Sequence, residues 1–366
     1  MTALLSRTPL TALIPTRNRP DECARQLRFL HGNAFAHRII VLDASEPENS
    51  EAVRRAASGI AEFRHFGPEY RMADKLAAAV ADVATPYVVL IPDDDIVLPL
   101  AIADAIAFLE GHPDFAVAHG YFIGFSLHFS PHVGTIDMHQ MLGFTPSIVD
   151  EQPLWRLYNL LRRYQSFYWG VFRTGIFRSA VTAACAMQVV VFRELTALST
   201  AILQGKVARL RSVYALHGPV KSHAAIHQSH PFFFFLRDAQ EFFGNYILFR
   251  DGIAAFIRRN GIEIPPSAPL EQLLDLAYAA YLGREVNTGV INHAVQLLLG
   301  DALPPILPEP APGWQEPARG DVVHHSSAGD RRYIWRRKVL DAEPRDEIAI
   351  SGEDIVRVER QLEHYR

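Results

Sequence analysis

Short apolar runs rich in β-branched residues alternate with helix-like segments over the first third of the chain. Runs of this kind are typical of strands that are buried on both faces, and they occupy residues 10–14, 38–42 and 87–91, while further short strands are predicted over 62–66 and 115–121. The segments between them predict helices over residues 21–30, 51–60, 72–83 and 100–109. Such alternation predicts an α/β fold in which a mostly parallel sheet with right-handed crossovers is flanked by helices.

Beyond residue 121 the pattern changes. Residues 124–150 look irregular, whereas 153–164 and 192–204 predict helices and 213–216 predicts a strand. From residue 231 onward, apolar side chains at helical spacing predict further helices, among them 270–281 and 290–299. Prolines crowd residues 303–320 and disfavour regular structure there, and a last amphipathic helix is predicted over 353–365. We therefore expect three parts: a sheet domain, a helical subdomain, and a proline-rich linker with a C-terminal tail, at 1–230, 231–302 and 303–366.

Composition narrows the class of protein. The chain has 366 residues, of which 49% are hydrophobic and 21% charged, and its formal net charge is −4. With no basic excess there is no electrostatic case for nucleic acid as a partner. No apolar run approaches the roughly 20 residues that span a bilayer, and the two cysteines have no metal-type spacing. We expect no transmembrane segment and a cytoplasmic location, with peripheral attachment at the inner membrane as the alternative. The C-terminal helical region is a candidate for homo-oligomerisation.

Three consecutive carboxylates follow one of the predicted buried strands. The run Tyr87–Ile91 stops at Pro92 and delivers Asp93, Asp94 and Asp95. Alternation along an extended chain places Asp93 and Asp95 on one side. Three adjacent acids repel one another unless a cation lies between them, and Mg²⁺ and Mn²⁺ prefer oxygen ligands. Ligands of open α/β sheets bind beyond the carboxyl ends of the strands, which favours a metal site over the alternative of a solvated acidic turn.

This stretch resembles the D-x-D region of metal-dependent glycosyltransferases with the GT-A fold, particularly the family-2-like enzymes of bacterial surface-glycan synthesis. The resemblance extends over roughly residues 8–215, since Ile14–Pro20 is similar to the first strand and nucleotide loop of that family. It implies that Asp93 and Asp95 hold a divalent metal, Mn²⁺ or Mg²⁺, against the diphosphate of a nucleotide-sugar. It also implies a set of nucleotide-binding residues, namely Pro15, Thr16, Arg17, Arg19, Asp43, Arg71, Lys75, Asp93 and Asp94. Within this set Asp43 would recognise the base, with a turn acid as its alternative role, and Arg71 and Lys75 could instead form a solvated helix face.

The same resemblance assigns residues on the acceptor side. The helix that contains Phe192–Leu198 is similar to the helix that carries the catalytic base of inverting members, which makes Glu194 the candidate base. The match is partial, because Leu195 stands where the family has a second acid. His217 and His223 are candidates for a further metal ligand, and Trp169 is a candidate for stacking on the acceptor sugar. The alternative for the histidines is solvated loop positions, and for most of the aromatic residues around Trp169 it is a place in the core.

Three functions remain open at the level of sequence. The first is a glycosyltransferase, with an inverting mechanism expected, that moves a sugar from a nucleotide-sugar to the hydroxyl of a glycan, lipid-linked or protein acceptor. The second is a sugar-1-phosphate nucleotidyltransferase, although the glycine-rich phosphate loop typical of that class is missing after the first strand. The third is a catalytically degenerate protein that binds nucleotide-sugars, which the missing acid beside Glu194 keeps open.

Overall fold

The computed structural model describes residues 9–129, 133–140, 147–164, 166–217, 230–266, 269–286, 321–328 and 331–338. Its strands are β1 (Leu10–Thr16), β2 (Arg38–Asp43), β3 (Glu62–His65), β4 (Tyr87–Leu90), β5 (Ile96–Val97), β6 (Phe115–Phe129), β7 (Val133–Gln140), β8 (Val171–Arg173), β9 (Lys206–His217), β10 (Asp321–Ala328) and β11 (Arg331–Lys338). Its helices are α1 (Pro20–Gly32), α2 (Pro47–Ala57), α3 (Met72–Ala81), α4 (Pro99–Gly111), α5 (Pro153–Arg162), α6 (Thr174–Ala184), α7 (Val190–Gln204), α9 (Pro231–Arg237), α10 (Ala239–Arg259) and α11 (Leu270–Glu285).

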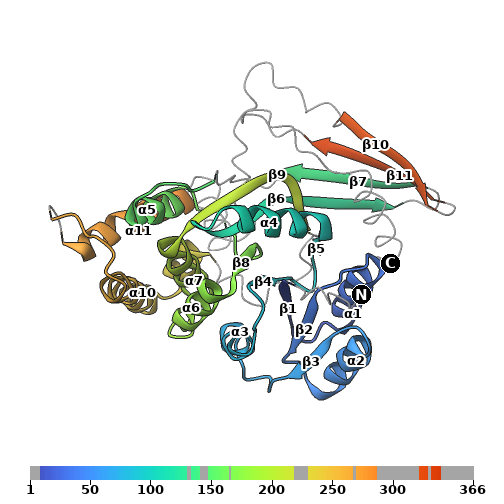
Figure 1. Cartoon of the computed structure of the whole chain (residues 1–366), viewed down its shortest axis with the longest axis horizontal. Coiled ribbons are helices and arrows are strands. Elements are labelled where there is room, and N and C mark those ends of the chain that lie inside the picture. The colour runs from blue at the N-terminus through green and yellow to red at the C-terminus, as the bar shows by residue number, and fades with distance from the viewer. Residues whose placement is uncertain are drawn as a thin grey trace, which may run out of the picture.

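The described strands form one 11-stranded sheet in the order β10-β11-β7-β6-β8-β4-β1-β2-β3, with β9 pairing both β5 and β6 (Figure 1). Strands β3, β2, β1 and β4 are parallel neighbours. Beyond β4 the sheet is mixed, because β8 runs antiparallel to both β4 and β6, while β9 is parallel to β6. The α/β fold predicted from the alternation is confirmed, and its parallel half is the part that the first predicted strands build.

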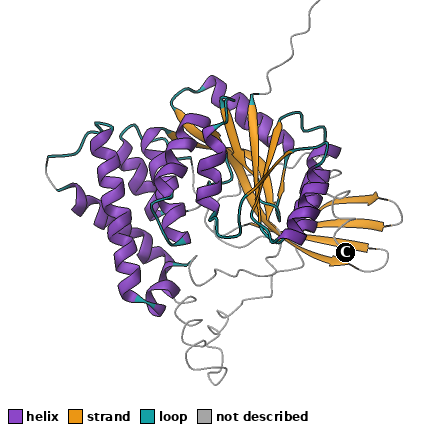
Figure 2. Cartoon of the chain, turned by 90° about the horizontal axis from the view of Figure 1, so that it is seen from below, coloured by secondary structure: helices purple, strands orange, loops and turns teal. Residues whose placement is uncertain are grey.

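Alternate residues of the parallel strands enter two different cores. Leu13, Ile40 and Val88 face a core shared with α3, α6 and α7, whereas Ala12, Val41 and Val89 face a core shared with α1, α2 and α4. This two-sided burial explains the continuous apolar runs of β2 and β4, in which nearly every residue is buried, whereas both ends of the edge strand β3 are exposed. Figure 2 shows the helices on either side of the strands.

The helical region after residue 230 packs on α5 and α7. Phe249 of α10 and Tyr278 of α11 belong to the same core cluster as Phe192 of α7 and Leu13 of β1. Figure 1 shows α10 and α11 at the side of the molecule away from β10 and β11. In the part of the chain that the structure describes, none of the helices has the length and apolar character needed to cross a membrane.

Two expectations about the chain after residue 121 need comment. The prediction of an irregular segment over 124–150 is wrong for β6, which continues to Phe129, and for β7, which pairs antiparallel with it. Hydrogen bonds to neighbouring strands hold these residues extended, although their local pattern lacks clear alternation. Part of the predicted tail also joins the sheet, since β11 pairs parallel with β7. The predicted helices over 290–299 and 353–365 lie outside the described residues.

Candidate functional site

The carboxyl ends of four parallel strands bring the predicted nucleotide-side residues to one edge of the sheet. Thr16 ends β1, Asp43 ends β2 and His65 ends β3, while Asp93 follows β4 after two more residues. The ends of parallel strands meet at a common edge, and this is where open α/β sheets bind ligands. The sequence segments that carry these residues therefore converge on a single candidate site.

Asp93 is the buried centre of this edge. The Thr16 hydroxyl donates to Asp93 Oδ2 at 2.8 Å, and Arg19 Nη1 lies 3.3 Å from Oδ1. The same Arg19 nitrogen donates to Asp94 Oδ2 at 2.6 Å, so one guanidinium contacts both acids. Burial and the neighbouring Asp94 charge raise the pKa of Asp93 to about 6, against the opposing hydrogen bonds from Thr16 and Arg19. The loop after β1 is thus tied directly to the acids after β4.

Asp95 faces a different partner. Strands β5 and β9 pair with Ile96 opposite Leu216, and one further step in this register puts Asp95 opposite His217. His217 Nδ1 lies 2.7 Å from Asp95 Oδ1, and Asp95 is only 4% exposed. The hydrogen bond and charge of Asp95 raise the pKa of His217. Asp93 and Asp95 are both buried while Asp94 is more exposed.

The donors at this edge suit a hard divalent cation. A buried carboxylate is a ligand type that Mn²⁺ and Mg²⁺ prefer, whereas an imidazole nitrogen suits softer transition metals better. Among the described residues there is no ready-made group of three or more His, Cys, Asp and Glu side chains that could hold a metal. A metal at Asp95 and His217 would therefore share its coordination with ligand oxygens, and Mg²⁺ commonly binds to one or two carboxylates together with phosphates.

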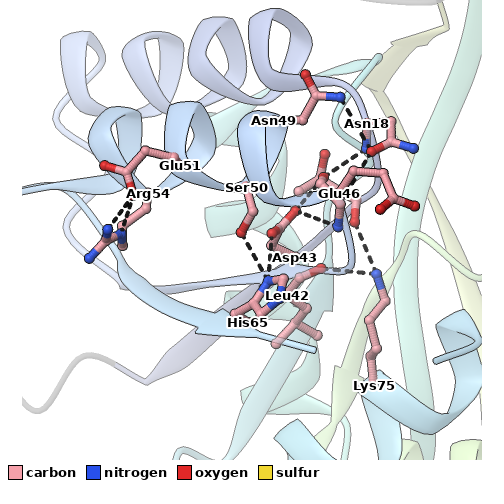
Figure 3. A network of polar contacts seen from close by, with 12 residues as sticks. Asn18, Leu42, Asp43, Glu46, Asn49, Ser50, Glu51, Arg54, His65 and Lys75 are labelled. Atoms are coloured by element: carbon pink, nitrogen blue, oxygen red, sulfur yellow. Dashed lines mark hydrogen bonds and ion pairs between the residues drawn. The ribbon is translucent and has the colours of Figure 1, made fainter. Parts of the chain in front are cut away.

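Asp43 is enclosed by polar partners (Figure 3). Its side chain is 0% exposed. Oδ1 accepts from the Ser45 amide at 3.1 Å and from the Ser45 hydroxyl at 2.5 Å, and Oδ2 lies 3.0 Å from His65 Nδ1. The Ser45 hydroxyl also accepts from the amide of Asn18 at 2.7 Å, which fastens the loop after β1 to the loop after β2. Through Ser45 and His65, Asp43 thus connects the loops after β1 and β2 with the end of β3, the part of the predicted site expected to hold the base.

Lys75 and Arg71, the two cations predicted on the phosphate side, are both engaged within the protein. Lys75 is 3% exposed, and its Nζ donates to the carbonyls of Thr16 and Leu42 at 3.0 Å each. It therefore links the ends of β1 and β2 beneath the edge (Figure 3). Arg71 forms an ion pair with Asp74 and donates to the Cys185 and Met187 carbonyls, which attaches α3 to the loop between α6 and α7.

Burial lowers the pKa of Lys75 to about 8, although the charges of Asp43 and Asp93 oppose this shift. The unfolded chain keeps the lysine proton up to about pH 10.4, so between these values the unfolded state binds more protons than the folded state. Stability should therefore rise with pH in this window. We predict that Lys75→Met removes this rise, on the order of 3 kcal/mol. Urea unfolding of both proteins from pH 7 to pH 10.5 measures it, and a constant difference between them would contradict the prediction.

Two further residues of the predicted nucleotide loop lie at the surface of this edge. Arg17 is exposed, and its positive charge contributes to the lowered pKa of Lys75, which places it close to the lysine. Pro15, two residues earlier, is half-buried within β1. Arg17 is thus an accessible cation near Lys75, as a phosphate-binding residue would need to be.

Trp169 lies at the same end of the sheet as the acids. Strand β8 begins with Val171 opposite Val89, near the carboxyl end of β4, and Trp169 lies in the turn directly before β8. The indole is half-buried and packs against both hydrophobic cores. The next residue must be glycine, because a Cβ at Gly170 would lie 2.8 Å from the Val117 side chain.

Glu194 lies on α7 and is held by a tyrosine. The Tyr164 hydroxyl donates to Glu194 Oε1 at 2.6 Å. Burial and the Glu194 charge raise the pKa of Tyr164, so the hydroxyl stays protonated as a donor. The Tyr281 ring of α11 meets the Tyr164 ring edge-on at 5.2 Å. The helix predicted from residue 192 begins two residues earlier, at Val190, so Glu194 lies in the second turn of α7.

The chain direction places Glu194 toward the carboxyl edge. Strands β4 and β6 run the same way, since both are antiparallel to β8, and β9 is parallel to β6. Helix α7 ends at Gln204, directly before β9 begins at Lys206, so α7 runs from the carboxyl edge back to the amino edge. Its first half, which includes Glu194, therefore lies at the end of the molecule where Asp93 and Trp169 are found.

The arrangement of these strands and helices is that of the GT-A fold, so the fold class expected from the sequence is confirmed. The structure of S. aureus TarS residues 1–349 in complex with UDP-GlcNAc is similar to this chain with a TM-score of 0.51 and 14% identity, over 80% of this chain and 76% of that one. The chain spans 50% of the longer TarS structure, with a TM-score of 0.42 and 13% identity over 77% of this chain. No family model and no curated protein matches the sequence.

A third similar structure is that of glucosyl-3-phosphoglycerate synthase from Mycobacterium tuberculosis in complex with Mn²⁺, UDP-glucose and phosphoglyceric acid. Its TM-score is 0.38, with 12% identity over 71% of this chain and 82% of that one. The likeness to TarS residues 1–349, at 14% identity, establishes the fold alone, so the function must be argued from the residues of this chain.

The structure brings together most of the predicted site residues and adds several that the sequence did not single out. His223 lies outside the described residues. His65, Ser45 and Tyr164 were missed, although each had a signal: His65 and Ser45 end or follow predicted strands, and Tyr164 closes a predicted helix. Strand ends next to a predicted site are therefore worth examining for every polar residue, and not only for acids.

Proposed function

We propose that this protein is a metal-dependent glycosyltransferase that moves a sugar from a nucleotide-sugar to an acceptor hydroxyl. The observation that carries the proposal is the pair of buried acids after β4, with Asp93 tied to the loop after β1 and Asp95 facing His217. Two further features support it: the edge where the carboxyl ends of the parallel strands meet, and a separate carboxylate, Glu194, at the same end of the sheet. A divalent metal bound there would supply positive charge beside the leaving diphosphate.

Residues of this chain take the remaining roles in binding and catalysis. Arg17 and Arg19 provide guanidinium groups for phosphate oxygens, a geometry that favours bidentate contacts. Glu194 takes the proton of the acceptor hydroxyl as it attacks, which makes the proposed mechanism an inverting one. Trp169 offers an aromatic face for the acceptor sugar. The acceptor class that we propose is a glycan, lipid-linked or protein hydroxyl of the kind used in bacterial surface-glycan synthesis or protein glycosylation.

The proposal predicts release of a nucleoside diphosphate from a matching nucleotide-sugar in Mn²⁺, and little release in EDTA. A panel of UDP-, GDP- and dTDP-sugars, assayed for nucleotide release with simple sugar acceptors and with water alone, measures this. Binding of a nucleotide-sugar with no release under any condition would instead favour a degenerate binding protein. Formation of pyrophosphate from a nucleoside triphosphate and a sugar-1-phosphate would favour a nucleotidyltransferase.

A further inference from the structure

The residue predicted to recognise the nucleobase has no surface with which to do so. Asp43 is 0% exposed, its Oδ1 accepts two hydrogen bonds from Ser45, and its Oδ2 is contacted by His65. A carboxylate oxygen offers about two acceptor positions, so Oδ1 is fully used. A base could meet Asp43 only after this arrangement had come apart. The group that Asp43 presents toward the edge is the His65 ring.

Asp43 also selects the tautomer of that ring when the imidazole is neutral. An ionised carboxylate can only accept hydrogen bonds, so the His65 Nδ1 that lies 3.0 Å from Oδ2 must carry the hydrogen. In a neutral imidazole the other nitrogen, Nε2, is then an acceptor. The Ser50 hydroxyl of α2, at 2.9 Å from Nδ1, and the stacked ring of Phe63 hold the imidazole in place.

The position of His65 suits the base end of a nucleotide. Its side chain is 46% exposed, and because Nδ1 faces the buried carboxylate, the exposed part of the ring carries Nε2. His65 ends β3, and three strand spacings across β2 and β1 separate it from β4 and the acids. That distance is about 14 Å, a span comparable to an extended nucleoside diphosphate whose phosphates lie at Asp93 and Asp95.

We infer that His65 Nε2 accepts a hydrogen bond from a ring N–H of the donor nucleobase and so selects uracil, whose N3 carries a hydrogen, over cytosine, whose N3 is itself an acceptor. This inference rests on the proposed function, because it assigns the base of the same nucleotide-sugar. With cytosine, two acceptors, His65 Nε2 and the base N3, would face each other and neither would receive a hydrogen bond. The expected preference for UDP over CDP is therefore on the order of 10- to 100-fold.

The test is titration of the full chain in Mn²⁺ with three probes: UDP, CDP, and UDP methylated at N3. The wild type should bind UDP most tightly, and N3-methylation should cost as much as the change to cytosine. His65→Ala should bind the three probes about equally. His65→Gln, whose amide oxygen can accept, should restore part of the preference. His112→Ala, an exposed histidine at the amino edge next to β6, is the matched control and should behave as wild type.

The outcomes separate this inference from the proposed function. If the wild type binds UDP and the His65→Ala variant prefers UDP over CDP just as strongly, another residue recognises the base. The inference about His65 is then overturned, while the proposed function stands. Equal binding of UDP and N3-methyl UDP by wild type would also overturn it. If wild type binds no nucleoside diphosphate or nucleotide-sugar, the proposed function fails and the inference fails with it.

Discussion

Asp95→Asn is expected to abolish the metal-dependent part of nucleotide binding while leaving the fold intact. The substitution keeps the size of a side chain that is 4% exposed and removes the charge that faces His217 at 2.7 Å. Removal of an outer partner of a metal ligand typically lowers metal affinity 10- to 100-fold, and we expect loss of a direct ligand to cost at least about that much. Nucleotide titrations in Mn²⁺ and in EDTA should therefore give nearly equal affinities for the variant.

Two further variants test whether the loss in Asp95→Asn reflects metal binding at this site. His217→Gln removes the other proposed ligand from a different strand and should reduce the same Mn²⁺ effect. Asp114→Asn is the control. Asp114 is an exposed acid directly before β6, at the opposite end of the strand from the site, where it pairs with Lys206 of β9. Its substitution should leave nucleotide binding unchanged. Unfolding midpoints close to wild type would show that the variants are folded. An unaltered Mn²⁺ effect in Asp95→Asn would exclude Asp95 as a ligand.

Glu194→Gln is expected to lower sugar transfer by about 10²-fold or more while donor affinity stays the same. The Glu194 carboxylate lies on α7 and is held by Tyr164, so loss of its charge removes the proposed base without changing the residues at the strand ends. The amide can still accept from Tyr164, which preserves the local hydrogen bond at Oε1. Single-turnover transfer and donor titration measure the two quantities separately. Hydrolysis of the donor to water should fall less than transfer does.

Tyr164→Phe and Glu110→Gln complete this experiment. Tyr164→Phe keeps the ring that packs on Tyr281 and removes only the hydroxyl that holds Glu194, so transfer should fall less than in Glu194→Gln. Glu110→Gln changes an exposed acid near the end of α4 and should transfer at the wild-type rate. Transfer by Glu194→Gln at nearly the wild-type rate would rule out this base, and a retaining mechanism would then be the better hypothesis.

The parallel half of the sheet could be read from the sequence because its information is local. Buried strands such as Leu10–Thr16 and Tyr87–Leu90 are continuous apolar runs, and their polar endings mark where each strand leaves the core. The acids after β4 and the loop after β1 were therefore predictable as parts of one edge, since parallel strands end together. The same reasoning failed for residues 124–140, where pairing with neighbouring strands, rather than local alternation, sets the conformation.

What only the tertiary structure decided is which partner each polar side chain meets. The register of β5 against β9 brings His217 to Asp95. The pairing of β2 with β3 places His65 next to Asp43, whose carboxylate it contacts. Burial of Lys75 beneath the strand ends likewise depends on the packing of α3. The sequence by itself determined where the carboxylates leave the strands. Their exposure and hydrogen-bond partners follow from contacts between segments distant in the chain, which no local pattern encodes.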